Sequence, residues 1–220
     1  MNLFDILGPV MVGPSSSHTA GAVRIGYISG KLLQDHVVKA EILLHGSFAT
    51  TGIGHGTDKA LIAGLLGMRP DDIRIPASFD LAKKAGMEFT FSTVTLKDAH
   101  PNTAVLRLTG QHGRKIEVQA ASIGGGRILI AKLDGIEVNF TAEKPTLIVH
   151  NVDQPGHVAQ VTTMLAEKQV NIATLQLYRD KRGGYAVMVI ETDQEVPEES
   201  VTWLEQLDGI IKVTYINVEE

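Results

Sequence analysis

The sequence has no cysteine, which excludes disulfides, a thiolate nucleophile and an iron–sulfur cluster bound in the usual way by thiolates of this chain. Any such cofactor would have to be held by another chain. A cluster of lysine and arginine is also missing, and the formal net charge is −5, so the chain lacks the positive surface that nucleic-acid binding normally requires. We expect its ligand to be a small molecule and not a nucleic acid.

Long apolar runs are absent as well. No run approaches the roughly 20 residues needed to span a bilayer, and the first residues, Met1–Asp5, lack the basic residues and apolar core of a signal peptide. We therefore expect no membrane association and a cytoplasmic location. Apolar residues still make up 44% of the 220 residues and are spread along the chain, which indicates ordinary globular folding. At this length we expect a principal domain of about 100–150 residues with a small companion.

The clearest domain boundary is the polar, proline-ended stretch over residues 141–145, which separates two segments that each read as strands. We predict a first domain over residues 1–141, a linker over 142–145 and a second domain over 146–220. The first domain should be α+β, with a largely antiparallel or mixed sheet. Its expected elements are a helix over residues 19–33, a strand over 39–44 with Ala40, Ile42 and Leu44 on one face, a glycine-rich loop leading into a helix over 58–66, a shorter helix capped near Ser78, and only strands from 103 on, joined by hairpins at 110–113, 124–126 and 134–135.

The second domain reads as β-α-β-β-α-β, the ferredoxin-like arrangement of two split βαβ units. Val158, Val161 and Leu165 are expected on the buried face of its first helix, which follows the turn over residues 153–156. The other expected elements are strands over residues 146–152, 172–179, 185–191 and 210–218, and a helix over 197–207.

Three serines and a histidine stand immediately before the first predicted helix, in the segment Gly13-Pro14-Ser15-Ser16-Ser17-His18-Thr19-Ala20-Gly21. The free N–H groups and positive end of that helix favour a carboxylate or phosphate, by about 0.3–1 kcal/mol. Two other interpretations stay open: one serine is only an N-cap, or a serine is a hydrolase nucleophile activated by His18. Sequence adjacency does not orient the imidazole towards a hydroxyl, and no Gly-x-Ser-x-Gly motif is present, so the hydrolase interpretation is the weaker.

A second polar segment follows the first predicted strand and runs from His45 to Lys59, with the sequence HGSFATTGIGHGTDK. Glycines at 52, 54 and 56 let the backbone approach a ligand and project His55 from between them. The spacing supports neither a dinucleotide fingerprint nor a phosphate-binding P-loop. We predict that His55 transfers protons, since histidine titrates near neutral pH. The alternatives are an exposed histidine in a tight turn and a zinc site built from His18, His45 and His55.

Taken together, the motifs Gly-Pro-Ser-Ser-Ser-His-Thr-Ala-Gly and Gly-Ser-x-x-x-Thr-Gly-x-Gly-His-Gly-Thr-Asp-Lys resemble the beta subunit of the bacterial iron–sulfur-dependent L-serine dehydratases. The resemblance covers essentially the whole chain, including a C-terminal domain that is similar to an ACT domain. It implies conversion of L-serine to pyruvate and ammonia by a [4Fe-4S] cluster that lies in an alpha part. Because the cysteines of that part are missing here, the resemblance implies the two-chain form, with a cysteine-bearing alpha subunit as partner and no activity or metal ligands in this chain alone.

The resemblance also implies a division of roles among the residues of the two segments. An open iron site on the partner would bind the substrate and act as a Lewis acid, while a base removes the α-proton. The candidate base is His55, with His18 second. The residues expected to bind the substrate or position the second segment are Ser15, Ser16, Ser17, Thr19, Thr57, Asp58 and Lys59.

The C-terminal domain carries a candidate effector site, as its resemblance to ACT domains implies. These domains usually pair side by side and bind an amino acid at the interface, so we expect self-association and an effector held by Asn151, Asp153, Gly156 and Asn171. The plainer alternative is that Asp153 is an N-cap, Pro155 a first-turn proline and Asn171 a C-cap. L-Serine is the natural candidate effector.

The sequence is compatible with two rival functions. The N-terminal fold also resembles the allosteric substrate-binding domain of some phosphoglycerate dehydrogenases, where the same scaffold is regulatory. The chain would then be a non-catalytic amino-acid sensor, an alternative that the lack of cysteine also favours. The other rival, a self-sufficient hydrolase or metal enzyme, would require activity from the purified chain alone.

Overall fold

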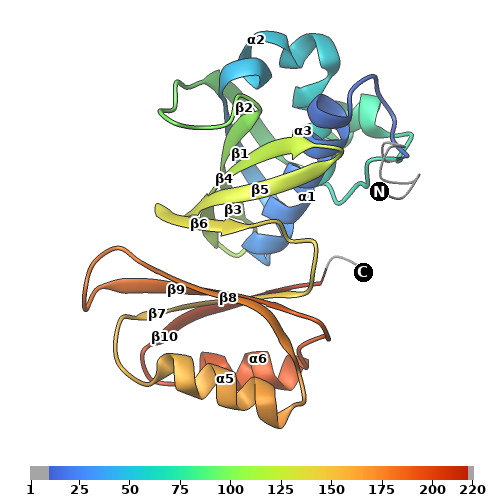
Figure 1. Ribbon diagram of the computed structural model, residues 1–220. Coiled ribbons are helices and arrows are strands. Elements are labelled where there is room, and N and C mark those ends of the chain that lie inside the picture. Colours follow the sequence, from blue (N-terminus) through green and yellow to red (C-terminus); the bar gives the residue numbers. More distant parts are fainter. Residues whose placement is uncertain (1–9, 218–220) are drawn as a thin grey trace, which may run out of the picture. The chain divides into compact units, whose positions relative to one another are not determined.

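The computed structural model describes residues 10–217 (Figure 1). The expectations for Met1–Asp5 and for Val218 therefore lie outside the described residues. The chain divides into two compact units, Met1–Gly135 and Ile136–Glu220. None of the helices among the described residues is long and apolar enough to cross a membrane.

A six-stranded mixed sheet organises the N-terminal part of the chain, as predicted. Its strand order is β2-β1-β3-β4-β5-β6, in which β1 pairs in parallel with β2 and antiparallel with β3. Strands β3, β4 and β5 follow one another in antiparallel pairs. The strands are β1 (Val37–Leu44), β2 (Glu88–Thr93), β3 (Thr103–Gly110), β4 (Lys115–Gly124), β5 (Arg127–Leu133) and β6 (Ile136–Phe140).

Strand β1 buries Ala40, Ile42 and Leu44, as its alternation predicts, and the three predicted turns do join β3 to β6. Strand β2 was not predicted. It is an edge strand on which Phe89 and Phe91 are only half-buried, and its other residues are exposed. Without a buried face it carries too little apolar alternation to be recognised from the sequence.

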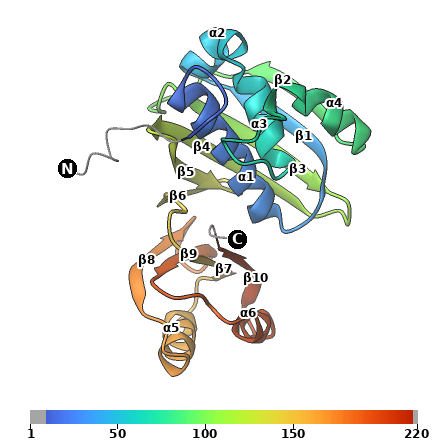
Figure 2. The ribbon, with the colours of Figure 1, turned by 90° about the vertical axis from the view of Figure 1, so that its right-hand side faces the viewer.

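Helix α1 (Gly21–Leu33) packs on α3 (Thr57–Leu65) and against β4, and Figure 2 shows the two helices side by side over the sheet. The predicted helix over residues 19–33 is confirmed, and a five-residue π-helical turn, Ser16–Ala20, precedes it without a break. The shorter helix is α4 (Ser78–Lys84), but Ser78 does not cap it. Its hydroxyl donates instead to the carbonyl of Lys59, at 2.8 Å, and so ties α4 to α3.

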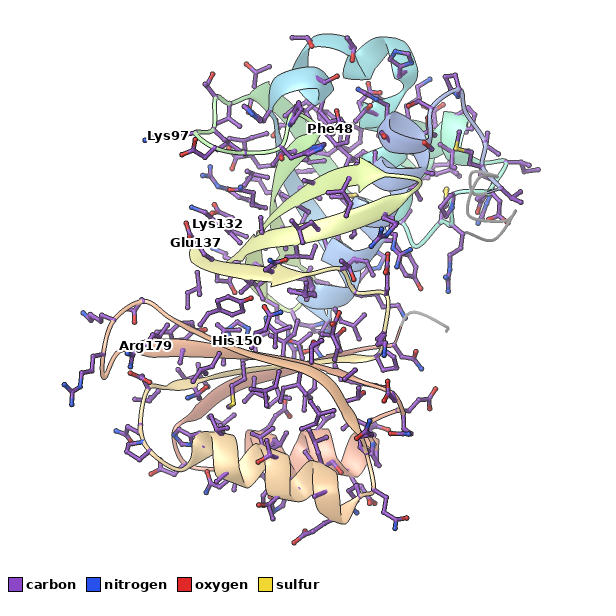
Figure 3. All side chains as sticks on the ribbon, viewed as in Figure 1. Phe48, Lys97, Lys132, Glu137, His150 and Arg179 are labelled. Atoms are coloured by element: carbon purple, nitrogen blue, oxygen red, sulfur yellow. The ribbon has the colours of Figure 1, made fainter. Side chains whose placement is uncertain are left out.

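The prediction of a glycine-rich loop before α3 is wrong, because most of the segment His45–Lys59 is helical. Helix α2 (Gly46–His55) fills it, and Gly56, at φ 72°, separates α2 from α3. Two contacts outweigh the poor helix propensity of the glycines. The N–H of Ser47 donates to the carbonyl of Pro101 at 2.7 Å, and the side chain of Phe48 is fully buried (Figure 3). Tertiary contacts therefore decide the conformation here.

The second unit contains a four-stranded antiparallel sheet with the order β10-β7-β9-β8 and two helices, α5 and α6, on one face (Figures 1 and 2). This confirms the predicted β-α-β-β-α-β order. The elements are β7 (Thr146–Val152), α5 (His157–Glu167), β8 (Ile172–Arg179), β9 (Tyr185–Thr192), α6 (Glu198–Glu205) and β10 (Ile210–Ile216). On α5, Val161 and Leu165 are buried in the core as expected, whereas Val158 is 38% exposed and does not belong to the buried face.

Candidate functional site

Two threonines join the segments that sequence analysis identified. The hydroxyl of Thr57, which begins α3, donates to the carbonyl of His18 at 2.9 Å. The hydroxyl of Thr19 donates in the opposite direction, to the carbonyl of His55 at 3.5 Å. Both threonines are buried, so their hydroxyls cross-link two stretches of backbone far from each other in sequence. The result is that the rings of His18 and His55 lie 5.1 Å apart, centre to centre.

The imidazole of His18 is held on both sides by hydroxyl groups. Its Nε2 lies 3.0 Å from the hydroxyl of Ser47 and 3.1 Å from that of Thr51, both on α2. Its Nδ1 lies 3.4 Å from the hydroxyl of Ser15. Because both nitrogens are occupied, the orientation of the ring is fixed by the protein.

The ring of Phe48 supports His18 from the protein interior. It meets the imidazole edge-on, with ring centres 5.4 Å apart and an angle of 64° between the planes. Such T-shaped pairs contribute about 0.5–1.5 kcal/mol beyond the area that they bury. Phe48 therefore anchors α2 and also sets the position of the imidazole.

The two histidines differ in their surroundings. Burial and the charge of neighbouring His55 lower the pKa of His18, and a backbone hydrogen bond with Ser47 partly offsets this. His18 is therefore favoured in its neutral form. The side chain of His55 is exposed at the end of α2, and its ring makes no hydrogen bond to the described residues. A free, exposed imidazole beside a fixed one is a suitable arrangement for proton transfer.

The serine cluster is the first turn of a continuous helical run. Ser15 is its N-cap, since its hydroxyl accepts from the N–H of His18 at 3.1 Å. The capping interpretation thus holds for this one serine. The hydroxyls of Ser16 and Ser17 are partly exposed and make no hydrogen bond to the described residues, so they are free to meet a ligand.

The other expected residues of the second segment lie at the start of α3. Asp58 is half-buried, and its carboxylate accepts from the N–H of Lys59 at 2.8 Å. The side chain of Lys59 is exposed. The structure therefore brings His18 and His55 together, with Ser15 against the ring of His18, while Thr19 and Thr57 serve the backbone connections and not an open surface.

The hydrolase and zinc alternatives find little support in this geometry. Ser47 and His18 are within hydrogen-bond reach, but Nδ1 of His18 faces the hydroxyl of Ser15, where a hydrolase triad would place a carboxylate. The side chain of His45 binds elsewhere, because its Nδ1 accepts from the N–H of Leu96 at 3.2 Å and not from the segment that holds His18 and His55. Within residues 10–217 no group of three or more histidine, aspartate or glutamate side chains is arranged to hold a metal ion.

In the second unit the expected effector residues do not all meet within one chain. Asn151 is buried near the end of β7, where its Oδ1 has no hydrogen-bond partner among the described residues. The carboxylate of Asp153 accepts from the N–H of Gly183 at 2.8 Å and from Arg179 at 3.1 Å, so it holds the turn after β8 and is not an N-cap. Gly156, at φ 110°, is the N-cap residue of α5.

Asn171 lies at the other end of this sheet. It directly precedes β8, and its side-chain amide donates to the carboxylate of Asp193 at 2.7 Å. Asn171 is not a helix C-cap, because α5 ends at Glu167 and Lys168 is its C-cap. Both β7 and β8 are antiparallel to β9, so they run parallel to each other, and the start of β8 lies at the opposite end from the Asn151–Gly156 segment. A site made of all four residues requires two chains.

Sequence analysis gave no role to Ser47, Phe48 or Thr51, although Ser47 and Thr51 are defined positions of the second motif. All three lie in the segment interpreted as a loop, so no periodicity suggested that they would point towards His18. Their signal is the spacing itself, since Ser47 and Thr51 are four residues apart and so lie on one side of a helix once the segment is known to be helical.

Comparison with known proteins supports the resemblances drawn from the motifs. The family models described as "Serine dehydratase beta chain" and "ACT domain" match residues 2–88 and 145–209. The chain is 37% identical over 216 residues to L-serine dehydratase, beta chain, of Peptoniphilus asaccharolyticus, covering 98% of this chain and 97% of that protein. It is 39% identical over 215 residues to the probable L-serine dehydratase, beta chain, of Bacillus subtilis, with the same coverage.

A more distant similarity connects the chain with a dehydrogenase. It is 26% identical over 200 residues to D-3-phosphoglycerate dehydrogenase of Methanocaldococcus jannaschii, covering 90% of this chain but only 37% of that protein. The resemblance of the fold to a part of such dehydrogenases, predicted from the sequence, is thereby confirmed.

Proposed function

Because the chain belongs to the serine dehydratase beta-chain family, with a C-terminal ACT domain, we propose that it is one subunit of a two-chain L-serine dehydratase. The reaction would convert L-serine to pyruvate and ammonia. The observation that carries the proposal is the pairing of His55 with His18, which belongs to a helical turn whose Ser16 and Ser17 hydroxyls make no hydrogen bond to the described residues. It supplies a base and hydrogen-bonding groups of the kind that a small hydroxy amino acid needs.

In this proposal the chain contributes binding and proton transfer. The hydroxyls of Ser16 and Ser17 and the positive end of the helical run that begins at Ser16 would receive the substrate carboxylate. His55 would take the α-proton, because its ring is exposed and not committed to other hydrogen bonds within the described part of the chain. The aminoacrylate released by water loss would become an imine and hydrolyse without further help from the protein.

A [4Fe-4S] cluster would be the cofactor, but this chain does not suit it as a host. The chain has no cysteine, and residues 10–217 present no alternative cluster of ligands. The cluster would belong to a cysteine-bearing alpha subunit, where it would act as a Lewis acid towards the hydroxyl that leaves. In this proposal, the chain contributes only its own serine and histidine side chains to the reaction.

Reconstitution tests the proposal directly. We expect this chain, co-expressed with the proteins encoded next to it and treated anaerobically to rebuild the cluster, to form a stable complex that produces pyruvate from L-serine. Each chain alone should be inactive, since the substrate contacts and the Lewis acid lie on different chains. Full activity of the partner without this chain would refute the catalytic role.

The main rival, a non-catalytic amino-acid sensor, rests on the similarity to D-3-phosphoglycerate dehydrogenase. A pull-down separates the two. The dehydratase proposal requires a stable complex with a cysteine-bearing chain, and the sensor does not.

The ACT domain is proposed to pair with a second copy and to bind an amino acid, with L-serine as the first candidate. Strand β8 is an edge strand. Antiparallel pairing of two such strands would bring Asn171 of one chain to the Asn151–Gly156 segment of its partner. We expect L-serine to shift the chain towards the dimer in sedimentation experiments and to release or take up heat in calorimetry.

Asn171→Ala should abolish that heat while the first unit keeps its fold, because the side chain lies on the surface of the second unit. If the dimer forms and no amino acid produces heat, the ACT domain only dimerises the enzyme.

A further inference from the structure

The hydroxyl of Thr51 has one proton, and helix α2 already uses it. Thr51 donates to the carbonyl of Ser47 at 2.9 Å, the bond that helical threonines commonly make to the residue four positions earlier. The same oxygen lies 3.1 Å from Nε2 of His18. With its proton on the carbonyl, Thr51 can only accept from that nitrogen. The hydrogen between them must therefore belong to Nε2.

The other contacts agree with this assignment. The hydroxyl of Ser47, 3.0 Å from Nε2 and 3.2 Å from the oxygen of Thr51, can accept from the ring and donate to Thr51. On the far side of the ring, Ser15 accepts from the N–H of His18, which leaves its own proton for Nδ1 at 3.4 Å. Every hydroxyl proton then has an acceptor. The opposite tautomer would leave Nε2 facing Thr51 with no hydrogen between them.

We propose that Thr51 is a positioning residue that fixes the tautomer of His18, with the proton on Nε2 and the lone pair of Nδ1 turned towards Ser15. This rests on the proposed function and deepens it, because it gives the two histidines different tasks. His18 is committed as a hydrogen-bond donor to α2 and holds the serine segment in place. His55 is left as the imidazole available to take up a proton.

Substitutions on α2 separate the two hydroxyls that face Nε2. In Ser47→Ala, Thr51 still only accepts, so His18 should keep its proton on Nε2. In Thr51→Val, Ser47 remains, and its hydroxyl can either donate or accept, so the preference for one tautomer should be lost. Thr51→Ser restores the acceptor and should restore the tautomer.

Nitrogen NMR of the full chain labelled with ¹⁵N-histidine measures this without any partner. The protonated and unprotonated ring nitrogens have well-separated resonances, and His18→Gln identifies the signals of His18 among the eight histidines. We expect one fixed tautomer in the wild type, Ser47→Ala and Thr51→Ser, and averaged resonances in Thr51→Val. A wild-type His18 with its proton on Nδ1, or a Thr51→Val spectrum identical to the wild type, would overturn the proposal.

Activity provides the second measurement. In the reconstituted enzyme, Thr51→Val should lower kcat about 10-fold or more with little change in KM, because a loosely held group is misplaced for the reaction, and Thr51→Ser should recover most of it. If the complex shows no dehydratase activity at all, the proposed function fails while the tautomer measurement still decides the role of Thr51. Equal kcat in the wild type and Thr51→Val would count against a positioning role.

Discussion

Replacing His55 with alanine is expected to lower kcat of the assembled dehydratase about 100- to 10,000-fold, the range that a positioned general base typically contributes. The ring lies 5.1 Å from the ring of His18, whose hydrogen bonds leave it poorly suited to accept a proton at Nε2. His55 is exposed at the end of α2, and its backbone and not its ring connects it to Thr19. The substitution should therefore remove the base and leave the fold unchanged.

A matched control is His36→Ala, which removes another exposed histidine from the turn between α1 and β1. It should keep near-normal turnover. Because the ring of His55 is exposed, added imidazole should partly restore the activity of His55→Ala, whereas it should do nothing for a misfolded variant. If His55→Ala binds its partner normally and keeps near-normal turnover, His55 is not the base.

The largest loss of stability is expected from Gly26→Ala in α1. A β-carbon at Gly26 would lie 2.2 Å from the carbonyl oxygen of Leu61 and 3.0 Å from the backbone nitrogen of Leu65, both on α3. Gly64 faces the same contact from α3, where a β-carbon would lie 2.0 Å from the carbonyl oxygen of Val23. These neighbours are backbone atoms and cannot turn aside, so the helices would have to separate. We expect the free energy of unfolding to fall by about 3 kcal/mol or more.

Gly30→Ala is the matched control, one turn further along the same helix. Its β-carbon would come no closer than 3.8 Å to any atom of α3, so alanine there should be neutral or add about 0.5–1 kcal/mol through its better helix propensity. Denaturation in urea, followed by circular dichroism, compares the two variants. Equal midpoints would show that the close approach of α1 and α3 contributes nothing.

Much of the fold could be predicted because its pattern is local. In the second unit, β7 and β8 match their predicted bounds, since a short run rich in apolar residues between turn residues is typical of a strand. The turn at Asp134 and Gly135 was equally clear, because both residues adopt positive φ angles, 49° and 83°, which few other residues tolerate.

Prediction failed where contacts far along the chain decide the conformation. Three glycines in the segment His45–Lys59 suggested a loop before the predicted helix over 58–66, but the buried ring of Phe48 and the carbonyl of Pro101 stabilise helix α2 there. Val158 fits the apolar periodicity of α5 and is nevertheless 38% exposed. Periodicity shows that a helix has an apolar face, but it does not show how much of that face the sheet covers.

The sequence by itself determined that this chain has no thiolate to hold a cluster, that a ferredoxin-like domain follows a mixed α+β domain, and that His18 and His55 are the candidate catalytic histidines. Composition and apolar periodicity suffice for the first two, because both can be read from the local sequence, whereas the two histidines stand out only through their motifs and the family that these motifs resemble. Only the tertiary structure decided that the two histidines meet and that they differ. Their contact depends on the crossed hydrogen bonds of Thr19 and Thr57, and the fixed orientation of His18 depends on hydroxyls of a helix that the local sequence disfavours. Interactions of this kind come from packing between distant segments, which no local pattern encodes.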